Sequence, residues 1–248
     1  LASPNSGRSF EEITTFIDAH PKWPSQALLR QRAEEAMTDA VPDEEILAWF
    51  KRSAPVTADG ATRQVKALLG AGQESAAIAL VRSSWINENF GNGQERRFLS
   101  RYGKYIDQET HQQRLDRLLW EGRLSTASRT MKYVSDDYRL LADARASLRA
   151  MEGGVDAALN RVPEKYRNDP GLIYERVRWR RIKDRDQEAR DLLLSQANDL
   201  AYISIRPQYW WLEKAILARR ALQKGHITDA YRLVANHGQT DAGDIAEA

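Results

Sequence analysis

The 248-residue sequence contains no cysteine, so it offers no disulfide framework, no thiolate metal site and no cysteine nucleophile. It also lacks a long apolar run. The best one, residues 76–81, is far shorter than the roughly 20 residues of a membrane-spanning helix, and we expect no transmembrane segment. The first residues, Leu1 to Pro4, lack the basic and apolar regions of a signal peptide, which leaves export open.

The sequence also lacks a large excess of positive or negative charge. The sequence has 37 Lys and Arg against 35 Asp and Glu, and this near-balance argues against a dedicated nucleic-acid-binding protein. The hydrophobic share of 42% is enough for a packed interior and too high for a disordered chain. Most basic residues are arginines, which suit bidentate pairing with carboxylates on helix surfaces.

No stretch alternates apolar and polar residues as a β-strand does. Apolar residues instead recur at helical spacing, as in Leu115, Leu118 and Leu119, and glycines and prolines separate these segments. The pattern predicts an all-α protein built from helices of three to four turns.

A weak internal repeat organises these helices. A turn residue is followed five positions later by alanine and, four positions further on, by an apolar residue. Glycine can end one helix in the left-handed conformation, and the alanine lets the next helix pack closely against it. The copies are Gly72–Ala77–Val81, Gly122–Ala127–Met131, Gly153–Ala158–Val162, Asp184–Ala189–Leu193 and Gly225–Ala230–Val234.

The repeat starts are spaced by 50, 31, 31 and 41 residues, which brackets the roughly 34-residue period of tetratricopeptide hairpins. We therefore predict a right-handed superhelix, an α-α solenoid, of tetratricopeptide-like helical hairpins. Residues 1–248 are expected to form one domain, in which an N-terminal segment, 1–56, can precede the repeat region, 57–248.

The sequence shows no catalytic, cofactor or metal site. The four histidines are never three or four residues apart, so no helix presents paired zinc ligands, and no glycine-rich nucleotide loop occurs. Adjacent acids on a helix diverge by about 100° and cannot face one cleft, so stabilisation of helix starts explains them better than glycosidase chemistry. Three such pairs follow helix-starting residues: Glu11-Glu12 after Ser9, Glu44-Glu45 after Pro42-Asp43, and Asp136-Asp137 after Ser135.

Two segments could contact a ligand. Residues 176–185 carry six basic side chains around Trp179, but acidic residues flank them, which is typical of a solvated helix face with ion pairs. In the pair Trp210-Trp211, Trp211 shares a helical stripe with Ala215 and Ala218. One indole is thus expected in the core, while the other lines a groove.

Three stretches carry a resemblance to a known family. They are His20-Pro21-Lys22-Trp23-Pro24 followed by residues 28–36, Leu118-Leu119-Trp120-Glu121-Gly122-Arg123 leading to Ala127, and residues 211–238. Together they resemble the N-terminal superhelical domain of the soluble lytic murein transglycosylases of Gram-negative bacteria. In that family a C-terminal lysozyme-like domain cleaves peptidoglycan and leaves a 1,6-anhydromuramic acid end.

The resemblance carries no catalytic residue to this chain. The family's acid/base glutamate stands in a Glu-Ser context followed by Gly-Leu-Met-Gln; here the sole Glu-Ser is Glu74-Ser75, and the second motif is absent. The resemblance implies a periplasmic location and a parent protein that continues beyond Ala248 into the lysozyme-like domain. It also implies peptidoglycan glycan strands as partners, for which Arg178, Arg181 and Trp210 are the candidate contacts.

The sequence is therefore compatible with three functions. The first is a non-catalytic scaffold domain of a periplasmic lytic transglycosylase. The second is a free-standing tetratricopeptide-like adaptor whose concave face binds a protein or peptide. The third and weakest is an RNA-binding protein that uses arginine and tryptophan.

Overall fold

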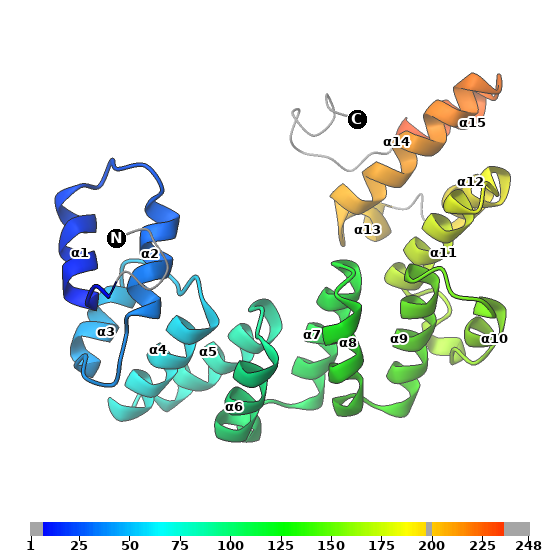
Figure 1. The fold of residues 1–248 in the computed structure, drawn as a ribbon. Coiled ribbons are helices and arrows are strands. Elements are labelled where there is room, and N and C mark those ends of the chain that lie inside the picture. Colours follow the sequence, from blue (N-terminus) through cyan, green and yellow to red (C-terminus); the bar gives the residue numbers. More distant parts are fainter. Residues whose placement is uncertain (1–6, 197–199, 236–248) are drawn as a thin grey trace. The chain divides into compact units, whose positions relative to one another are not determined.

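The computed structural model describes residues 7–196 and 200–235, and these residues form α-helices and short 3₁₀-helices with no strand among them (Figure 1). The predicted all-α class is confirmed. No helix in the described ranges is both long and apolar enough to cross a membrane.

The chain divides into two compact units, residues 1–114 and 115–248, and the division falls inside α7 (Gln108–Trp120). Residues 7–56 pack on α4 (Ala58–Gly70) through α3 (Asp43–Phe50), and the Glu34 carboxylate accepts the N–H groups of Val56 and Thr57 at 2.9 and 2.8 Å. That segment therefore belongs to the first unit. The other helices of this unit are α1 (Phe10–Ala19), α2 (Gln26–Glu35), α3 (Asp43–Phe50), α4 (Ala58–Gly70), α5 (Glu74–Asn87), α6 (Asn92–Tyr102) and η1 (Gly103–Tyr105).

The second unit continues the series of helices from the end of α7. Its core joins Trp120 to apolar residues of α11, α12, α14 and α15. Its helices are α8 (Leu124–Thr130), η2 (Met131–Tyr133), α9 (Asp136–Arg149), α10 (Val155–Asn160), η3 (Glu164–Tyr166), α11 (Pro170–Ile182), α12 (Asp186–Gln196), α13 (Leu200–Ile203), α14 (Pro207–Gln223) and α15 (Ile227–Ala235).

The helix starts follow the predicted acidic pairs. Ser9 caps α1 in a reciprocal capping box with Glu12, and Ser135 accepts the N–H of Tyr138 at the start of α9. Helix α3 begins at Asp43, directly after Pro42. The placement of these acids at helix N-termini is confirmed. Glu12 accepts the N–H of Ser9, and all of the acids interact favourably with the helix dipole.

Five helices end in the same hydrogen-bonded turn. Gly122, for example, donates its N–H to the Leu119 carbonyl at 3.1 Å, and Arg123 donates to the Leu118 carbonyl at 2.9 Å. This pair of bonds defines a Schellman motif, which requires a left-handed residue after the helix. The residues in that conformation are Gly72 (φ 69°), Gly122 (70°), Met151 (57°), Asp184 (57°) and Gly225 (79°).

The third repeat departs from the predicted register. Met151, and not Gly153, ends α9 in the left-handed conformation, and Gly154 (φ 72°) begins α10 in the same conformation. The connection is therefore longer than in the other repeats. The predicted repeat begins at Gly153 because glycine most readily takes the left-handed conformation, and nothing in the sequence indicates that Met151 takes it.

All five repeat alanines are buried, as predicted. Ala77, Ala127 and Ala189 are fully inaccessible, and Ala158 and Ala230 are 7% and 3% exposed. Each lies in a hydrophobic cluster formed by its own helix pair and the adjoining helices. The pairs are α4–α5, α7–α8, α9–α10, α11–α12 and α14–α15.

Arginines tie the first helices of successive pairs to one another. Arg149 donates to the Trp120 carbonyl at 3.3 Å, Arg178 to the Arg149 carbonyl at 3.4 Å, and Arg220 to the Arg181 carbonyl at 3.3 Å. Each acceptor lies in the last turn of the preceding first helix. Cationic side chains there satisfy carbonyls that the helix leaves unpaired and complement its dipole.

Candidate functional site

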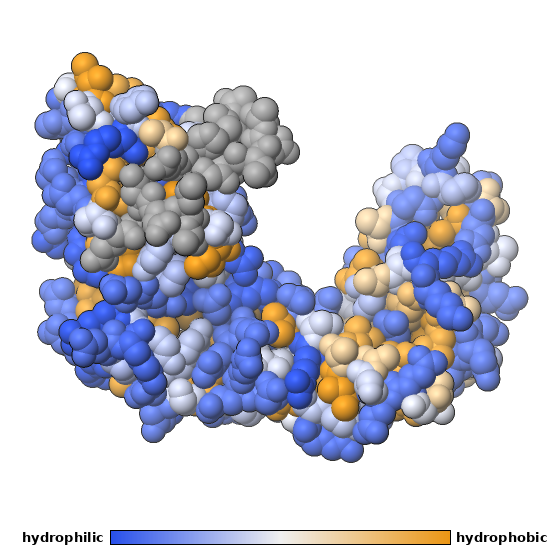
Figure 2. Space-filling model, turned by 180° about the vertical axis from the view of Figure 1, so that it is seen from behind, coloured by the Kyte–Doolittle hydropathy of each residue, from blue (hydrophilic) through white to orange (hydrophobic). Residues whose placement is uncertain are grey.

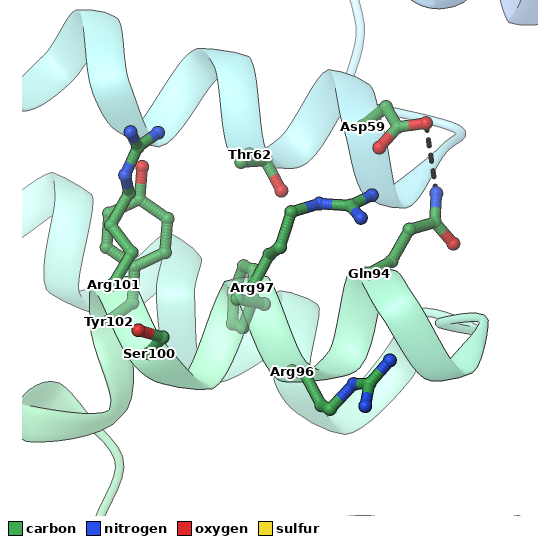
Figure 3. Close-up of a pocket in the computed structure, with 9 residues that line it drawn as sticks. Asp59, Thr62, Gln94, Arg96, Arg97, Ser100, Arg101 and Tyr102 are labelled. Carbon is green, nitrogen blue, oxygen red and sulfur yellow. Dashed lines mark hydrogen bonds between the residues drawn. The ribbon is translucent and has the colours of Figure 1, made fainter.

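A groove of about 460 Å³ lies between α4 and α6 in the first unit (Figure 3). Its floor is tightly packed: Phe98 and Tyr102 are only 2% exposed, their ring centroids lie 5.2 Å apart, and Phe98 stacks on Trp85. The polar rim comes from both helices. The lining residues are Asp59, Thr62, Gln94, Arg96, Arg97, Phe98, Ser100, Arg101 and Tyr102.

The rim is basic. Arg96, Arg97 and Arg101 are exposed, and Figure 3 shows Arg97 between the two helices and Arg101 beside Tyr102. The acidic rim residue, Asp59, accepts a hydrogen bond from the Gln94 amide at 2.9 Å. Within the described ranges, no carboxylate forms an ion pair with any of the three arginines.

Two basic residues of α4 outside the groove are paired with carboxylates. Arg63 lies 2.6 Å from Asp43 and Lys66 lies 2.5 Å from Asp39. Lys66, and to a smaller extent the charges of Arg63 and Arg101, lower the pKa of Asp39. Burial raises the pKa of Tyr102, and the adjacent Arg101 opposes that rise. At neutral pH the phenol is therefore a neutral hydrogen-bonding group beside exposed guanidinium groups.

Such a groove is suited to recognising carboxylates or phosphates. Guanidinium groups bind them through paired N–H donors, and the neighbouring Thr62, Ser100 and Gln94 can bond to hydroxyls or amides of the same ligand. Because the arginines are exposed, the attraction is weakened by salt. The described residues contain no group of three or more His, Asp or Glu side chains arranged to hold a metal ion.

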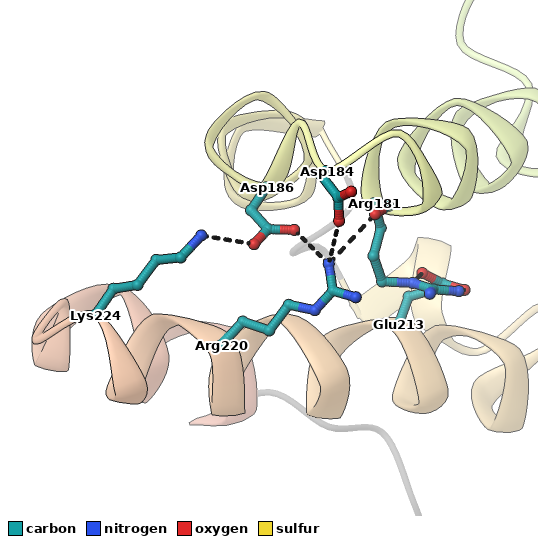
Figure 4. A network of polar contacts seen from close by, with 6 residues as sticks. All are labelled: Arg181, Asp184, Asp186, Glu213, Arg220 and Lys224. Carbon is teal, nitrogen blue, oxygen red and sulfur yellow. Dashed lines mark hydrogen bonds and ion pairs between the residues drawn. The ribbon is translucent and has the colours of Figure 1, made fainter.

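The predicted contact Arg181 is engaged within the protein. Its Nε and Nη2 donate to the two carboxylate oxygens of Glu213 at 2.5 and 2.8 Å, and Glu213 is fully buried (Figure 4). Removing either partner would leave a buried charge without compensation. Arg181 therefore holds α14 against α11.

Arg178 is also used structurally. It donates to the Arg149 carbonyl and lies 3.8 Å from the Glu175 carboxylate. Glu175 is only 1% exposed, and burial raises its pKa to about 7 although Arg149 and Arg178 oppose the rise. In place of the expected projection toward a polymer, Arg181 contacts Glu213 of α14, and Arg178 contacts the Arg149 carbonyl of α9 and Glu175 of its own helix.

A second network surrounds the start of α12. Arg220 of α14 pairs with Asp186 at 2.8 Å and with Asp184 at 3.6 Å, and Lys224 pairs with Asp186 at 3.0 Å (Figure 4). Asp184 and Asp186 are therefore paired with α14, while Glu188 pairs with Arg180 and Arg185 of the segment itself. This agrees with the predicted ion-paired character of that segment.

Trp210 cannot contact a glycan in this structure, because its side chain is fully buried. Its ring meets those of Tyr174 at 5.6 Å and Trp120 at 6.3 Å in edge-to-face contacts. The expectation of one core indole is confirmed, but that indole is Trp210, while Trp211 lines a groove. Helix α14 has apolar residues on two faces, so one stripe could not identify the inner face.

Comparisons with known proteins found no matching family, no similar curated protein and no similar solved structure.

The arginines of the α4–α6 groove were missed at the level of sequence. A signal was present: Arg97 and Arg101 are one helical turn apart, and no acidic residue lies four positions from either one. Residues 176–185 hold more basic residues, but most of their arginines have partners within the protein. Charge density in sequence did not reveal which arginines have carboxylate partners in space.

Proposed function

We propose that the chain is a helical scaffold that binds an acidic polymer, and that it serves as the superhelical domain of a periplasmic soluble lytic murein transglycosylase acting on peptidoglycan. The observation that carries the proposal is the α4–α6 groove, in which Arg96, Arg97 and Arg101 are exposed in an otherwise charge-balanced chain. The family assignment rests on the sequence resemblance.

The chemistry of the groove supports this ligand class. Peptidoglycan carries carboxylates on its stem peptides and hydroxyls and amides on its sugars. Guanidinium groups suit the carboxylates, and the side chains of Thr62, Gln94 and Ser100 suit the uncharged groups. The groove would hold a strand while a catalytic domain acts on it.

The architecture supports a scaffold role. Five helix pairs share the Schellman turn and the buried alanine, as stacked repeats do. In this proposal they form the predicted right-handed, tetratricopeptide-like superhelix, and the lysozyme-like domain of the parent protein supplies catalysis.

The proposal is tested by co-sedimentation with purified sacculi. We expect Arg97→Ala/Arg101→Ala to bind roughly tenfold more weakly, since two exposed charged contacts of about 0.7 kcal/mol each amount to that factor. Binding of the unmodified chain should weaken between 50 and 500 mM salt.

The matched control is Arg161→Ala/Arg167→Ala, which removes two exposed arginines of the second unit and the same net charge. Equal weakening in both double variants would show that the arginines act only through non-specific charge attraction. Unchanged binding in the Arg97/Arg101 variant would exclude the groove as the polymer site.

The alternative function is a tetratricopeptide-like adaptor for proteins or peptides. The observation that favours it is a second, apolar groove between α14 and α15. Retention of a protein ligand without binding to sacculi would support the adaptor over the scaffold.

A further inference from the structure

The groove between α14 and α15 has a volume of about 500 Å³ and a mostly apolar lining. Three of its large apolar side chains are well exposed: Leu222 at 56%, Ile227 at 69% and Tyr231 at 71%. In Figure 2, where α14 and α15 lie at the upper left, apolar residues reach the surface near their end. Grouped exposed apolar side chains mark binding surfaces more often than scattered ones do.

The preceding pair, α11–α12, has an equivalent groove, and the element bound there indicates what the α14–α15 groove can bind. Asp184 and Gly225 are the left-handed residues of the two turns, which sets an offset of 41 residues between the pairs. The offset aligns Ala189 with Ala230, both buried, and Leu193 with Val234. The two grooves are therefore equivalent positions in consecutive repeats.

Helix α14 covers the α11–α12 groove and contacts both helices. At the ends of this contact, Arg181 pairs with Glu213 of α14, and Asp186 pairs with Arg220. Asp186 is consequently only 5% exposed, whereas its equivalent Ile227 is 69% exposed. An α14-like helix is thus the element that fits this position.

The two grooves differ in chemistry. The offset places Leu222 where α11 has Arg181, Ile227 where α12 has Asp186, and Tyr231 where α12 has Arg190. Arg190 is 2% exposed and lies 3.6 Å from Asp229. A bound helix with the charges of α14 would find no opposite charge on the α14–α15 groove, because Leu222 and Ile227 stand there. Its charged groups would face apolar side chains without a partner.

We propose that the α14–α15 groove binds an amphipathic helix of a partner polypeptide, which lies across the pair as α14 lies across α11–α12. The bound helix has large apolar residues at the positions where α14 has Glu213 and Arg220. This mode is helix-in-groove recognition, with apolar anchors spaced by whole helical turns.

Two other occupants fit less well. Residues 236–248 contain one large apolar residue, Ile245, and cannot supply an apolar stripe. A second copy has no other matching face within the described ranges, since its remaining exposed large apolar residues are dispersed. These residues are Trp23, Val56, Ile182, Ile205 and Leu212.

The test uses two labelled peptides of residues 207–224, one unmodified and one carrying E213L/R220L, titrated with the full chain and followed by fluorescence anisotropy. We expect the modified peptide to bind at least about tenfold more tightly. In the protein variant L222R/I227D, which restores the charges of the preceding pair, the preference should reverse.

The control variant L212S changes an exposed leucine of α14 that does not line the groove, and it should leave both affinities within about twofold. Unchanged thermal unfolding by circular dichroism would show that L222R/I227D still folds. Equal binding of both peptides, or binding insensitive to L222R/I227D, would overturn the proposal. Dimerisation of the chain that L222R abolishes would assign the groove to a second copy and overturn the proposal. Peptide binding seen only after removal of residues 236–248 would assign the groove to that segment and overturn it too.

Discussion

Buried arginines in this chain act as connectors between helices. Arg114 is fully buried, lies 4.1 Å from the centre of the Trp85 ring, and donates to the carbonyls of Trp85 and Glu88. Its guanidinium also lies 3.8 Å from the Glu95 carboxylate. A buried charge is tolerated when hydrogen bonds and an opposite charge compensate for lost hydration, and here those partners end α5 and position α6.

His111 makes the stability of the first unit depend on pH. Its Nδ1 accepts the Trp85 indole N–H at 3.1 Å, which requires the neutral ring. Burial, and next the charge of Arg114, lowers its pKa to about 4. Between the unfolded pKa of about 6.5 and this value, the unfolded chain binds a proton that the folded chain does not. Stability is therefore complete above pH 6.5 and falls as the pH approaches 4.

We predict that His111→Gln flattens this pH dependence, because glutamine cannot take up the proton. The unmodified chain should lose up to about 3 kcal/mol from this group between pH 6.5 and 4. Urea unfolding at a series of pH values measures the difference. His226→Gln, at an exposed position, is the control and should follow the unmodified chain; identical slopes in all three proteins would contradict the assignment.

At the scale of single elements, the Schellman turns set where each pair bends back. Gly122 and Gly72 have nearly the same φ, 70° and 69°, but different surroundings. A Cβ atom on Gly122 would lie 2.8 Å from Nη2 of Arg149, whereas one on Gly72 meets nothing within 4 Å. Arg149 cannot move freely, because it bonds to Trp120 and Glu175.

The two glycines thus form a matched pair for mutation. Gly72→Ala should lower the free energy of unfolding by about 1 kcal/mol, because alanine is strained in the left-handed conformation. Gly122→Ala should lower it by the same amount plus about 1–3 kcal/mol, because the new methyl group displaces Arg149. Urea unfolding followed by circular dichroism measures both losses. Equal losses would show that Arg149 moves aside without cost.

The buried alanines allow the paired helices to approach each other closely. Ala127 is inaccessible in the cluster of Leu115, Leu118 and Leu119, so Ala127→Leu should overpack it and cost about 1–3 kcal/mol. Ala76→Leu, an identical change at an exposed position of α5, should stay within about 0.5 kcal/mol. Chemical denaturation compares the two, and a neutral effect at Ala127 would argue against a tightly packed pair.

At the scale of the whole molecule, we predict that the chain alone does not release 1,6-anhydromuropeptides from sacculi. That reaction needs a positioned acid/base carboxyl within a sugar cleft. Glu74, the glutamate of the Glu-Ser pair, is exposed in the first turn of α5 and lines none of the grooves described here. Incubation with sacculi followed by analysis of soluble products is the test. Product above a buffer control that disappears in Glu74→Gln would make the chain an enzyme.

Local sequence determined the helices and much of their pairing. Ser9 and Ser135 mark helix starts, and the repeat alanines mark buried contacts, because capping and helical periodicity depend on residues within a few positions. The Gly153 register was wrong since Met151 adopts the left-handed conformation that glycine was expected to supply.

The tertiary structure alone decided which polar and aromatic side chains remain available. Arg181 meets Glu213 across 32 residues of sequence, and Trp210 meets Trp120 across a still longer separation, so local pattern could place neither partner. Arg97 and Arg101 are less conspicuous in the sequence, yet they line the open groove between α4 and α6, and no carboxylate of the described residues lies within ion-pair distance of them. Charge pairing and burial depend on neighbours from other helix pairs, and the irregular repeat spacing prevents a sequence pattern from predicting those neighbours.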